Sequence, residues 1–194
     1  MPSRYSPHSP NTAARFVLIS RWRMTCPSQP IWALLTDLES WPHWWPQVSR
    51  VRLLHRAPVG EAGTHAALTW RSPLGYRFTI EVLNTRRERA ADGHCEIEGR
   101  SSGDLLGQGL WVLDPVPVPD QVPGTGAAAS VQQVDVTYRY EVELGKRWMR
   151  IAAPLLRIFF KWSHFAVMEA GAKGMAARLN CSSSQPKHWT MSQR

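Results

Sequence analysis

Three polar side chains are the best candidates for acid–base chemistry in this sequence of 194 residues: His164, Arg100 and Asp104. A histidine, an arginine and a carboxylate can move a proton and stabilise charge where a fold brings them together. No motif links the three, and a histidine among aromatic residues is also typical of ordinary packing. The sequence has no Gly-x-Ser-x-Gly elbow, and its seven histidines lack the spacing of a metal site. We therefore assign no catalytic residue, no metal and no cofactor.

Residues 103–109, GDLLGQG, contain the glycines of a phosphate-binding loop. Such a loop must hold the phosphate at the start of a helix. Here a strand pattern follows instead, Leu110–Leu113, and no helix. The glycines therefore favour curvature of a sheet or the close approach of another element, and nucleotide binding is not expected.

The net charge of +8 is concentrated in particular segments of the chain. Residues 16–145 hold twelve basic and fourteen acidic side chains, whereas residues 146–180 hold seven basic side chains against Glu169 alone. The two tails, 1–15 and 181–194, add four basic residues. This distribution does not match a nucleic-acid groove spread over a fold, so no nucleic-acid partner is expected.

Cysteine spacing and apolar patterning indicate a cytoplasmic protein. Cys26, Cys95 and Cys181 are far apart and form no Cys-x-x-Cys pair, which is typical of free thiols in a reducing compartment. Basic and histidine side chains interrupt the most apolar stretch, Trp148–Met168, so it is too polar to span a membrane. No apolar segment of a secretory signal precedes Phe16.

The pattern of apolar residues predicts one domain over residues 16–180, between two polar tails, 1–15 and 181–194, that are expected to be disordered. Residues 16–25 alternate as a strand, and prolines divide residues 27–46 into two short helices. Six further segments alternate and predict strands: 48–56, 64–71, 76–82, 94–100, 105–113 and 134–144. An apolar stripe at three-to-four spacing then predicts one long helix over 153–180.

This order of elements and several local strings match those of a known family. The strings are Trp32 with Asp37, Trp41-Pro42, Trp44-Trp45-Pro46, Gly103-Asp104-Leu105 with Gly107, Thr137-Tyr138-Arg139-Tyr140, Ala153-Pro154, and Met168 with Gly171. Over residues 16–180 the chain resembles the helix-grip (SRPBCC, START-like) superfamily of lipid-transfer proteins, plant allergens and bacterial polyketide cyclases. The resemblance implies an α+β helix-grip fold of the Bet v 1/START type, in which a curved seven-stranded antiparallel sheet surrounds a long C-terminal helix.

The resemblance also implies an apolar cavity between sheet and long helix. Eight aromatic side chains would face it: Trp22, Trp70, Phe78, Trp111, Tyr138, Tyr140, Phe159 and Trp162. Their alternative role is plain core packing. Three further tryptophans, Trp41, Trp44 and Trp45, would rim the mouth of the cavity, or else pack the short helices onto the sheet.

The function implied is non-covalent binding of a hydrophobic small molecule, such as a lipid, sterol or polyketide, for carriage or sequestration. The alternative is a polyketide cyclase or dehydratase that uses the same cavity. Basic residues alternate with Trp148 and Met149 over residues 146–161, which fits either weak contact with an anionic membrane or a solvated helix face.

Overall fold

The computed structural model describes residues 15–73, 75–117, 132–143 and 153–192. Within these ranges one antiparallel sheet has eight strands in the order β2-β3-β4-β5-β6-β7-β1-β8. The strands are β1 Arg15–Met24, β2 Val48–His55, β3 His65–Arg71, β4 Arg77–Arg89, β5 Cys95–Gly103, β6 Leu106–Val116, β7 Gln133–Glu143 and β8 Lys187–Ser192. The helical elements are α1 Ser28–Thr36, the 3₁₀ turn η1 Leu38–Ser40, α2 Trp41–Trp44 and α4 Ala153–Arg178.

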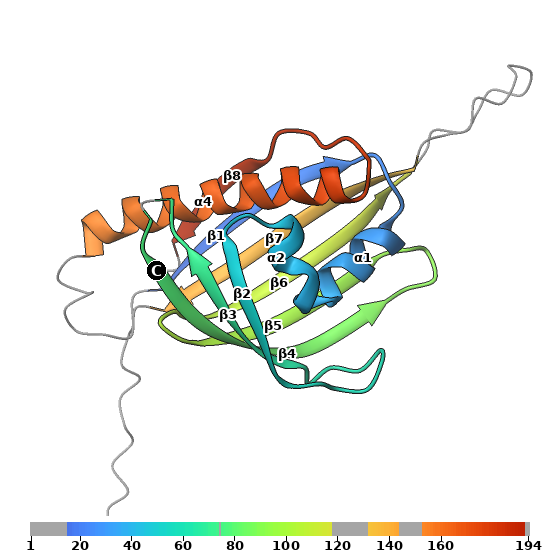
Figure 1. Ribbon diagram of the computed structural model, residues 1–194. Coiled ribbons are helices and arrows are strands. Elements are labelled where there is room, and N and C mark those ends of the chain that lie inside the picture. The colour runs from blue at the N-terminus through green and yellow to red at the C-terminus, as the bar shows by residue number, and fades with distance from the viewer. Residues whose placement is uncertain (1–14, 74, 118–131, 144–152, 193–194) are drawn as a thin grey trace, which may run out of the picture.

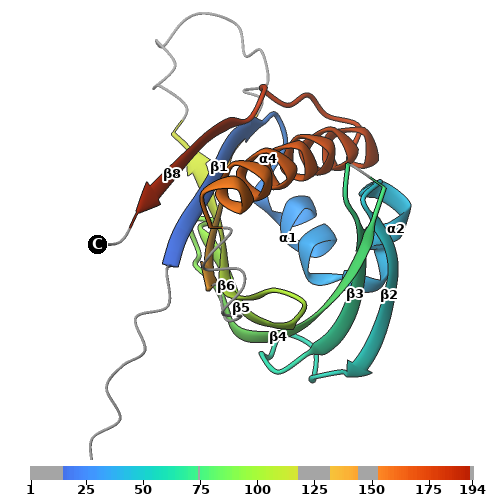
Figure 2. The same cartoon turned by 90° about the vertical axis from the view of Figure 1, so that its left-hand side faces the viewer.

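The sheet is strongly curved, and α4 lies across its open side (Figure 1). Seen along α4, the strands form an arc that the long helix and α1 close (Figure 2). The short helices α1 and α2 lie between β1 and β2, where the chain crosses from one side of the sheet to the other. The α+β helix-grip fold expected from the sequence is thereby confirmed.

The strand count of seven was wrong, because the C-terminal segment supplies an eighth strand. Asn180 takes a left-handed backbone conformation, with φ 51°, and turns the chain after α4. β8 then pairs with β1, from Arg21↔Lys187 to Phe16↔Ser192. The expected disordered tail over 181–194 is therefore incorrect for these six residues, since β8 occupies hydrogen-bonding groups of β1 that would otherwise be free.

Several other expectations lie outside the described residues. They concern the N-terminal tail up to residue 14 and the first part of the basic segment, which falls within the undescribed residues 144–152; residues 118–131, after β6, are also outside the description. No helix in the part of the chain that the structure describes is long and apolar enough to cross a membrane.

Two glycines of α4 allow the helix to lie directly against the tryptophan-rich junction after α2. A Cβ at Gly174 would collide with the backbone of Trp44, and one at Gly171 would collide with the indole of Trp45. The helix backbone therefore contacts these residues at a distance that only glycine permits. This packing fixes the height of α4 above the sheet and so the width of the space between them.

Candidate functional site

A cavity of about 160 Å³ lies between the concave face of the sheet and α4. Strands β1 and β3 to β7, helix α4, and the segment from the end of α1 to Trp45 contribute its walls. Most of the lining side chains are aliphatic or aromatic. The polar lining residues are few: Thr36, Asn84, Arg87, Glu98, Ser101, Ser163 and His164, together with tyrosines 76, 138 and 140. The composition is typical of a site for a largely apolar small molecule.

The structure places five of the eight expected lining residues at the cavity: Trp70, Phe78, Trp111, Tyr138 and Tyr140. All five lie on strands, where the side chains alternate and the sequence pattern gives the inward face directly.

The other three expected lining residues have different positions. Trp22 is buried in the core beside the cavity, with its ring edge-to-face against Trp111 at 6.0 Å between centroids. Trp162 is 50% exposed on α4, because Ser163, Val167 and Met168 form the inward face of that helix. The side chain of Phe159 lies outside the described residues.

The cluster Trp41, Trp44 and Trp45 is buried and forms no exposed rim. Trp45 packs against Trp41 and Trp44, with ring centroids 5.1 Å and 5.3 Å away, and its indole Nε1 donates to the Val167 carbonyl of α4 at 2.9 Å. Trp41 and Trp45 contribute to the cavity wall, whereas Trp44 does not. The cluster therefore packs the short helices onto the sheet and α4, which is the alternative that the sequence left open.

One side of the cavity carries a stack of three polar rings. His164 of α4 lies parallel to both Tyr138 and Tyr140 of β7, with centroids 6.0 Å and 6.1 Å away. The Tyr140 hydroxyl shares a hydrogen bond of 2.7 Å with Ser101 Oγ. The Tyr138 hydroxyl makes no hydrogen bond to any described residue, and the same is true of His164 Nε2.

Burial sets the ionisation of this stack. It raises the pKa of both tyrosines, so the phenols stay protonated at neutral pH. Burial, and then the neighbouring His188, lower the pKa of His164 to about 3, so its imidazole is neutral. The stack therefore offers a ligand uncharged hydrogen-bond donors and acceptors rather than a charge.

The other two acid–base candidates lie away from the cavity. Arg100 is exposed on β5. Asp104 follows β5, and its Oδ2 accepts a hydrogen bond of 2.9 Å from the Thr79 amide, which fixes the turn into β6. Gly103, with φ 92°, occupies the same turn, so the glycine-rich run forms a β-hairpin rather than a phosphate loop. The structure does not bring His164, Arg100 and Asp104 together.

Two side-chain groupings escaped the sequence analysis because they join the chain's two ends. Cys26 and Cys181 place their sulfur atoms 3.3 Å apart as free thiols. His188 of β8 contacts Ser20 Oγ through Nδ1 at 2.9 Å and Glu169 through Nε2 at 3.8 Å. Ser20 is completely buried, so this set fastens β8 and provides no accessible nucleophile. No cluster of metal-binding side chains occurs among the described residues.

Comparisons with known proteins agree with this geometry. The chain is similar to a START superfamily protein from Mycobacterium smegmatis, with 16% identity, a TM-score of 0.57, and coverage of 84% of this chain and 97% of the other. It is also similar to the Zhui aromatase/cyclase from Streptomyces sp. R1128, with 13% identity, a TM-score of 0.57, and coverage of 84% and 96%. For human STARD10 the identity is 12%, the TM-score 0.56, and the coverage 89% and 73%.

At these identities the likeness to solved structures shows the fold alone. No curated protein matches the sequence significantly. A family match is more specific, because residues 24–170 fit the family described as "Polyketide cyclase / dehydrase and lipid transport". That range contains the cavity, the tryptophan cluster and the inward face of α4. The chain therefore belongs to the polyketide cyclase/dehydrase and lipid transport family.

Proposed function

We propose that the protein binds a hydrophobic small molecule non-covalently in the cavity between the sheet and α4, for carriage or sequestration. The observation that carries the proposal is the cavity itself: a largely apolar space with a few polar groups, such as the Tyr138 hydroxyl and His164 Nε2, that have no hydrogen-bond partner among the described residues. Polar groups buried without partners are costly, and a ligand that supplies hydrogen bonds offsets that cost. The family match supports the proposal, since the family description includes lipid transport.

A second candidate function is a cyclase or dehydratase reaction in the same cavity. Its specific support is the neutral imidazole of His164 beside two phenol hydroxyls, together with the fold shared with an aromatase/cyclase. A general base works best when its pKa lies near the working pH. Because the pKa of His164 is lowered to about 3, the imidazole is a weak base at neutral pH, and this favours binding over catalysis.

A direct search for bound ligand tests the proposal. Native mass spectrometry of the purified protein, followed by organic extraction, should reveal a co-purifying apolar molecule. The uncharged dye Nile red should bind and be displaced by fatty acids or sterols. A protein that yields no ligand and does not bind the dye would contradict the proposal, whereas turnover of a poly-ketone substrate that is lost in His164→Gln would favour the cyclase.

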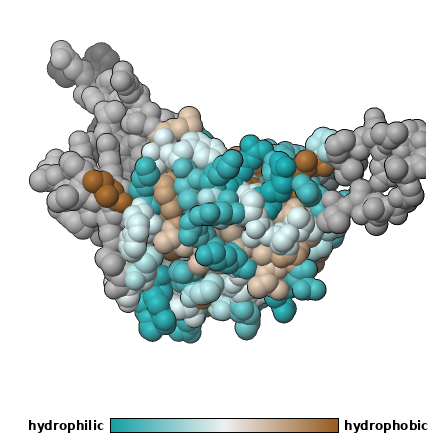
Figure 3. Space-filling model, turned by 90° about the horizontal axis from the view of Figure 1, so that it is seen from above, coloured by the Kyte–Doolittle hydropathy of each residue, from teal (hydrophilic) through white to brown (hydrophobic). Residues whose placement is uncertain are grey.

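Two expectations about the protein's surroundings belong to the same proposal. The exposed Ile158 and Lys161 of α4 continue the basic segment, which fits either weak contact with an anionic membrane or a solvated helix face. Figure 3 shows apolar atoms in small separate areas of the face seen from above, among more hydrophilic ones, which fits transient rather than permanent contact. Co-sedimentation with acidic vesicles at low salt tests this contact. The free thiols support a cytoplasmic location.

A further inference from the structure

A β-bulge turns one arginine into the cavity. Alternate residues of β4 from Phe78 to Asn84 line the cavity, and unbroken alternation would bring Arg86 inward. The register between β4 and β5 shifts between Asn84 and Arg86, so that Arg87, opposite the inward-facing Ile97, lines the cavity instead. A bulge inserts one residue and reverses the faces beyond it. Arg87 is the one lysine or arginine among the described lining residues.

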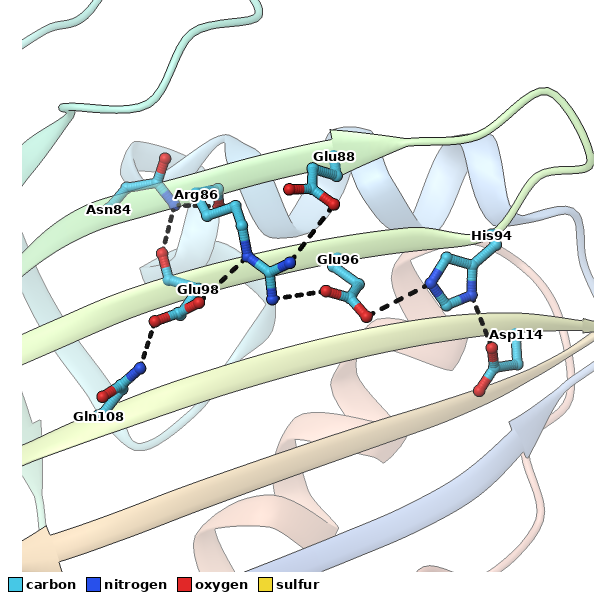
Figure 4. A network of polar contacts seen from close by, with 8 residues as sticks. All are labelled: Asn84, Arg86, Glu88, His94, Glu96, Glu98, Gln108 and Asp114. Carbon is cyan, nitrogen blue, oxygen red and sulfur yellow. Dashed lines mark hydrogen bonds and ion pairs between the residues drawn. The ribbon is translucent and has the colours of Figure 1, made fainter.

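Arg86, on the same strand, differs from Arg87 because its charge is paired with carboxylates. On the outer face it pairs with Glu96 at 2.6 Å, Glu98 at 3.1 Å and Glu88 at 3.4 Å (Figure 4). The bulge itself is held by Asn84, whose Nδ2 donates to the backbone carbonyl of Glu98 at 2.8 Å. Asn84 also positions Arg87, whose Nε donates to Asn84 Oδ1 at 2.7 Å.

Arg87 forms no ion pair with any carboxylate in the described part of the chain. The one acidic residue of the cavity lining, Glu98, directs its carboxylate to Arg86 on the outer face, and the same carboxylate accepts a hydrogen bond from Gln108. Burial lowers the pKa of Arg87, and no neighbouring acid counteracts this. The guanidinium nevertheless stays charged at neutral pH. Its terminal nitrogens therefore carry a positive charge at the edge of an apolar space.

The position of Arg87 makes it reachable from outside. Together with Thr36 and Leu38 it borders both the cavity and a surface groove between the α1–η1 segment and the loop after β2. The acidic residues of that groove are Asp37, which is exposed, and Glu39, which is paired with Arg56. An anion at Arg87 would lie where groove and cavity meet, with its apolar part directed inward.

Strand pairing defines which cavity-lining residues follow Arg87 across the sheet. Arg87, Ile97, Trp111 and Tyr138 form one row across β4 to β7, and all four line the cavity. Three strand spacings of about 4.8 Å separate the ends of the row by about 14 Å along the sheet. The row thus runs from a cation, across an aliphatic and an aromatic side chain, to a phenol that has no hydrogen-bond partner among the described residues.

We infer that the ligand is a small amphiphilic monocarboxylic acid, whose carboxylate binds the terminal nitrogens of Arg87 and whose apolar body lies over Ile97 and Trp111. Arginine pairs with carboxylates through two parallel hydrogen bonds, and the guanidinium of Arg87 has the geometry to form both. A cavity of about 160 Å³ favours a single-chain or single-ring acid over a diacyl lipid. The inference rests on the proposed function, because it names the ligand class of the same cavity.

A comparison of two probes that differ only in their head group tests the inference. Decanoate and 1-decanol, both below their aggregation concentrations, would displace Nile red from the wild-type protein, from Arg87→Met and from the matched control Arg89→Met. Arg89 is an exposed arginine of the same strand outside the cavity lining, so its loss removes one charge without altering the site. We expect the wild type and Arg89→Met to prefer decanoate by about 10- to 100-fold, and Arg87→Met to lose that preference. Arg87→Lys should retain part of it.

Each result separates the inference from the proposed function. If the wild type binds both probes equally well, the carboxylate inference fails while ligand binding stands. If Arg87→Met keeps the preference for decanoate, Arg87 is not the anion site. If the wild type binds neither the dye nor either probe, the inference and the proposed function fall together. The wild-type preference needs no variant, so a folding defect in Arg87→Met would not obscure the answer.

Discussion

Polar side chains on the two faces of the sheet differ in how many hydrogen-bond and ion-pair partners they have. On the outer face of β4, β5 and β6, Arg86 pairs with three glutamates, and His94 lies 2.7 Å from Asp114 and 3.5 Å from Glu96 (Figure 4). On the inner side, Arg87 and Tyr138 of the sheet and His164 of α4 face the cavity and have few or no hydrogen-bond partners among the described residues. The outer groups satisfy one another, so they are explained by the fold alone. The inner groups are not, and this difference indicates which face is reserved for a ligand.

The pKa of a histidine is also shifted in opposite directions on the two sides of the sheet. The hydrogen bond to Asp114 raises the pKa of His94 on the outer face, which favours the charged imidazole. Burial lowers the pKa of His164 on the inner face, which favours the neutral one. Stability should therefore respond to pH with opposite signs at the two positions.

Of the substitutions that test this contrast, loss of a core tryptophan beside the cavity should have the largest effect on the free energy of unfolding. Trp45→Ala removes a buried indole, its hydrogen bond to the Val167 carbonyl and its contacts with Trp41 and α4. The loss of a buried tryptophan typically costs about 3–5 kcal/mol. Chemical denaturation should show a free energy of unfolding lower by that amount. A loss below about 1 kcal/mol would mean that the tryptophan cluster does not determine the stability of the helix–sheet interface.

Acid should destabilise the protein through His164. Because the pKa of His164 is about 3 in the folded protein and near 6.5 in the unfolded chain, protonation favours unfolding between these values. The stabilisation is complete above about pH 6.5, and each pH unit below it removes up to about 1.4 kcal/mol. Denaturation at pH 7 and pH 4.5 should therefore show a smaller loss for His164→Gln than for the wild type.

The lowered pKa of His188 and that of Asp135, which Arg23 and Arg21 hold down, act in the same direction. Both groups are present in wild type and variant, so the difference between the two proteins reports His164 together with its electrostatic coupling to His188. Equal losses in the two proteins would show that His164 is not buried as described.

Ligand binding should depend on the phenol of Tyr138, which lines the cavity. Tyr138→Phe removes a hydroxyl from the end of the inward row and leaves the ring stacked on Trp111, 4.3 Å between centroids. If the hydroxyl bonds the ligand, affinity should fall by about 0.5–1.5 kcal/mol. Tyr140→Phe is the comparison, because its hydroxyl already pairs with Ser101. Displacement of Nile red by a hydroxylated or keto-acid probe measures both, and an unchanged affinity in Tyr138→Phe would remove the phenol from the site.

The sequence predicted the order of elements because alternation along the strands and a long C-terminal helix survive in the structure, and the resemblance to a known family supplied the fold. It predicted the strand residues of the cavity for the same reason, since Trp70, Trp111 and Tyr138 follow the two-residue period. The bulge after Asn84 breaks that period, and no glycine or proline in the sequence marks its position. The sequence therefore did not predict that Arg87 lines the cavity. Arg86 and Arg87 are the same residue type, and only the register against β5 separates their roles.

Other differences have equally local causes. The inward face of α4 lies about one residue away from the stripe predicted, which moves Trp162 outward, because a helix position turns by about 100° per residue. β8 was missed because a polar stretch precedes it and its pairing partner, β1, lies at the other end of the chain. Contacts between the chain's ends leave no periodic signal in the sequence.

The smallest effect should come from the outer histidine, and its sign distinguishes the two faces. Since the pKa of His94 is raised in the folded protein, its stabilisation is complete below the unfolded value near 6.5 and is lost as the pH rises through the folded value. His94 is about one-third exposed, so solvent screening should keep the effect well under about 1 kcal/mol. Between pH 6 and pH 8.5 the wild type should lose slightly more stability than His94→Gln, whereas the His164 contribution, which both proteins share, can only increase over this interval until it is complete above about pH 6.5. A loss on acidification at both histidines would contradict the contrast between the faces, because it would place both imidazoles in environments that disfavour their charge.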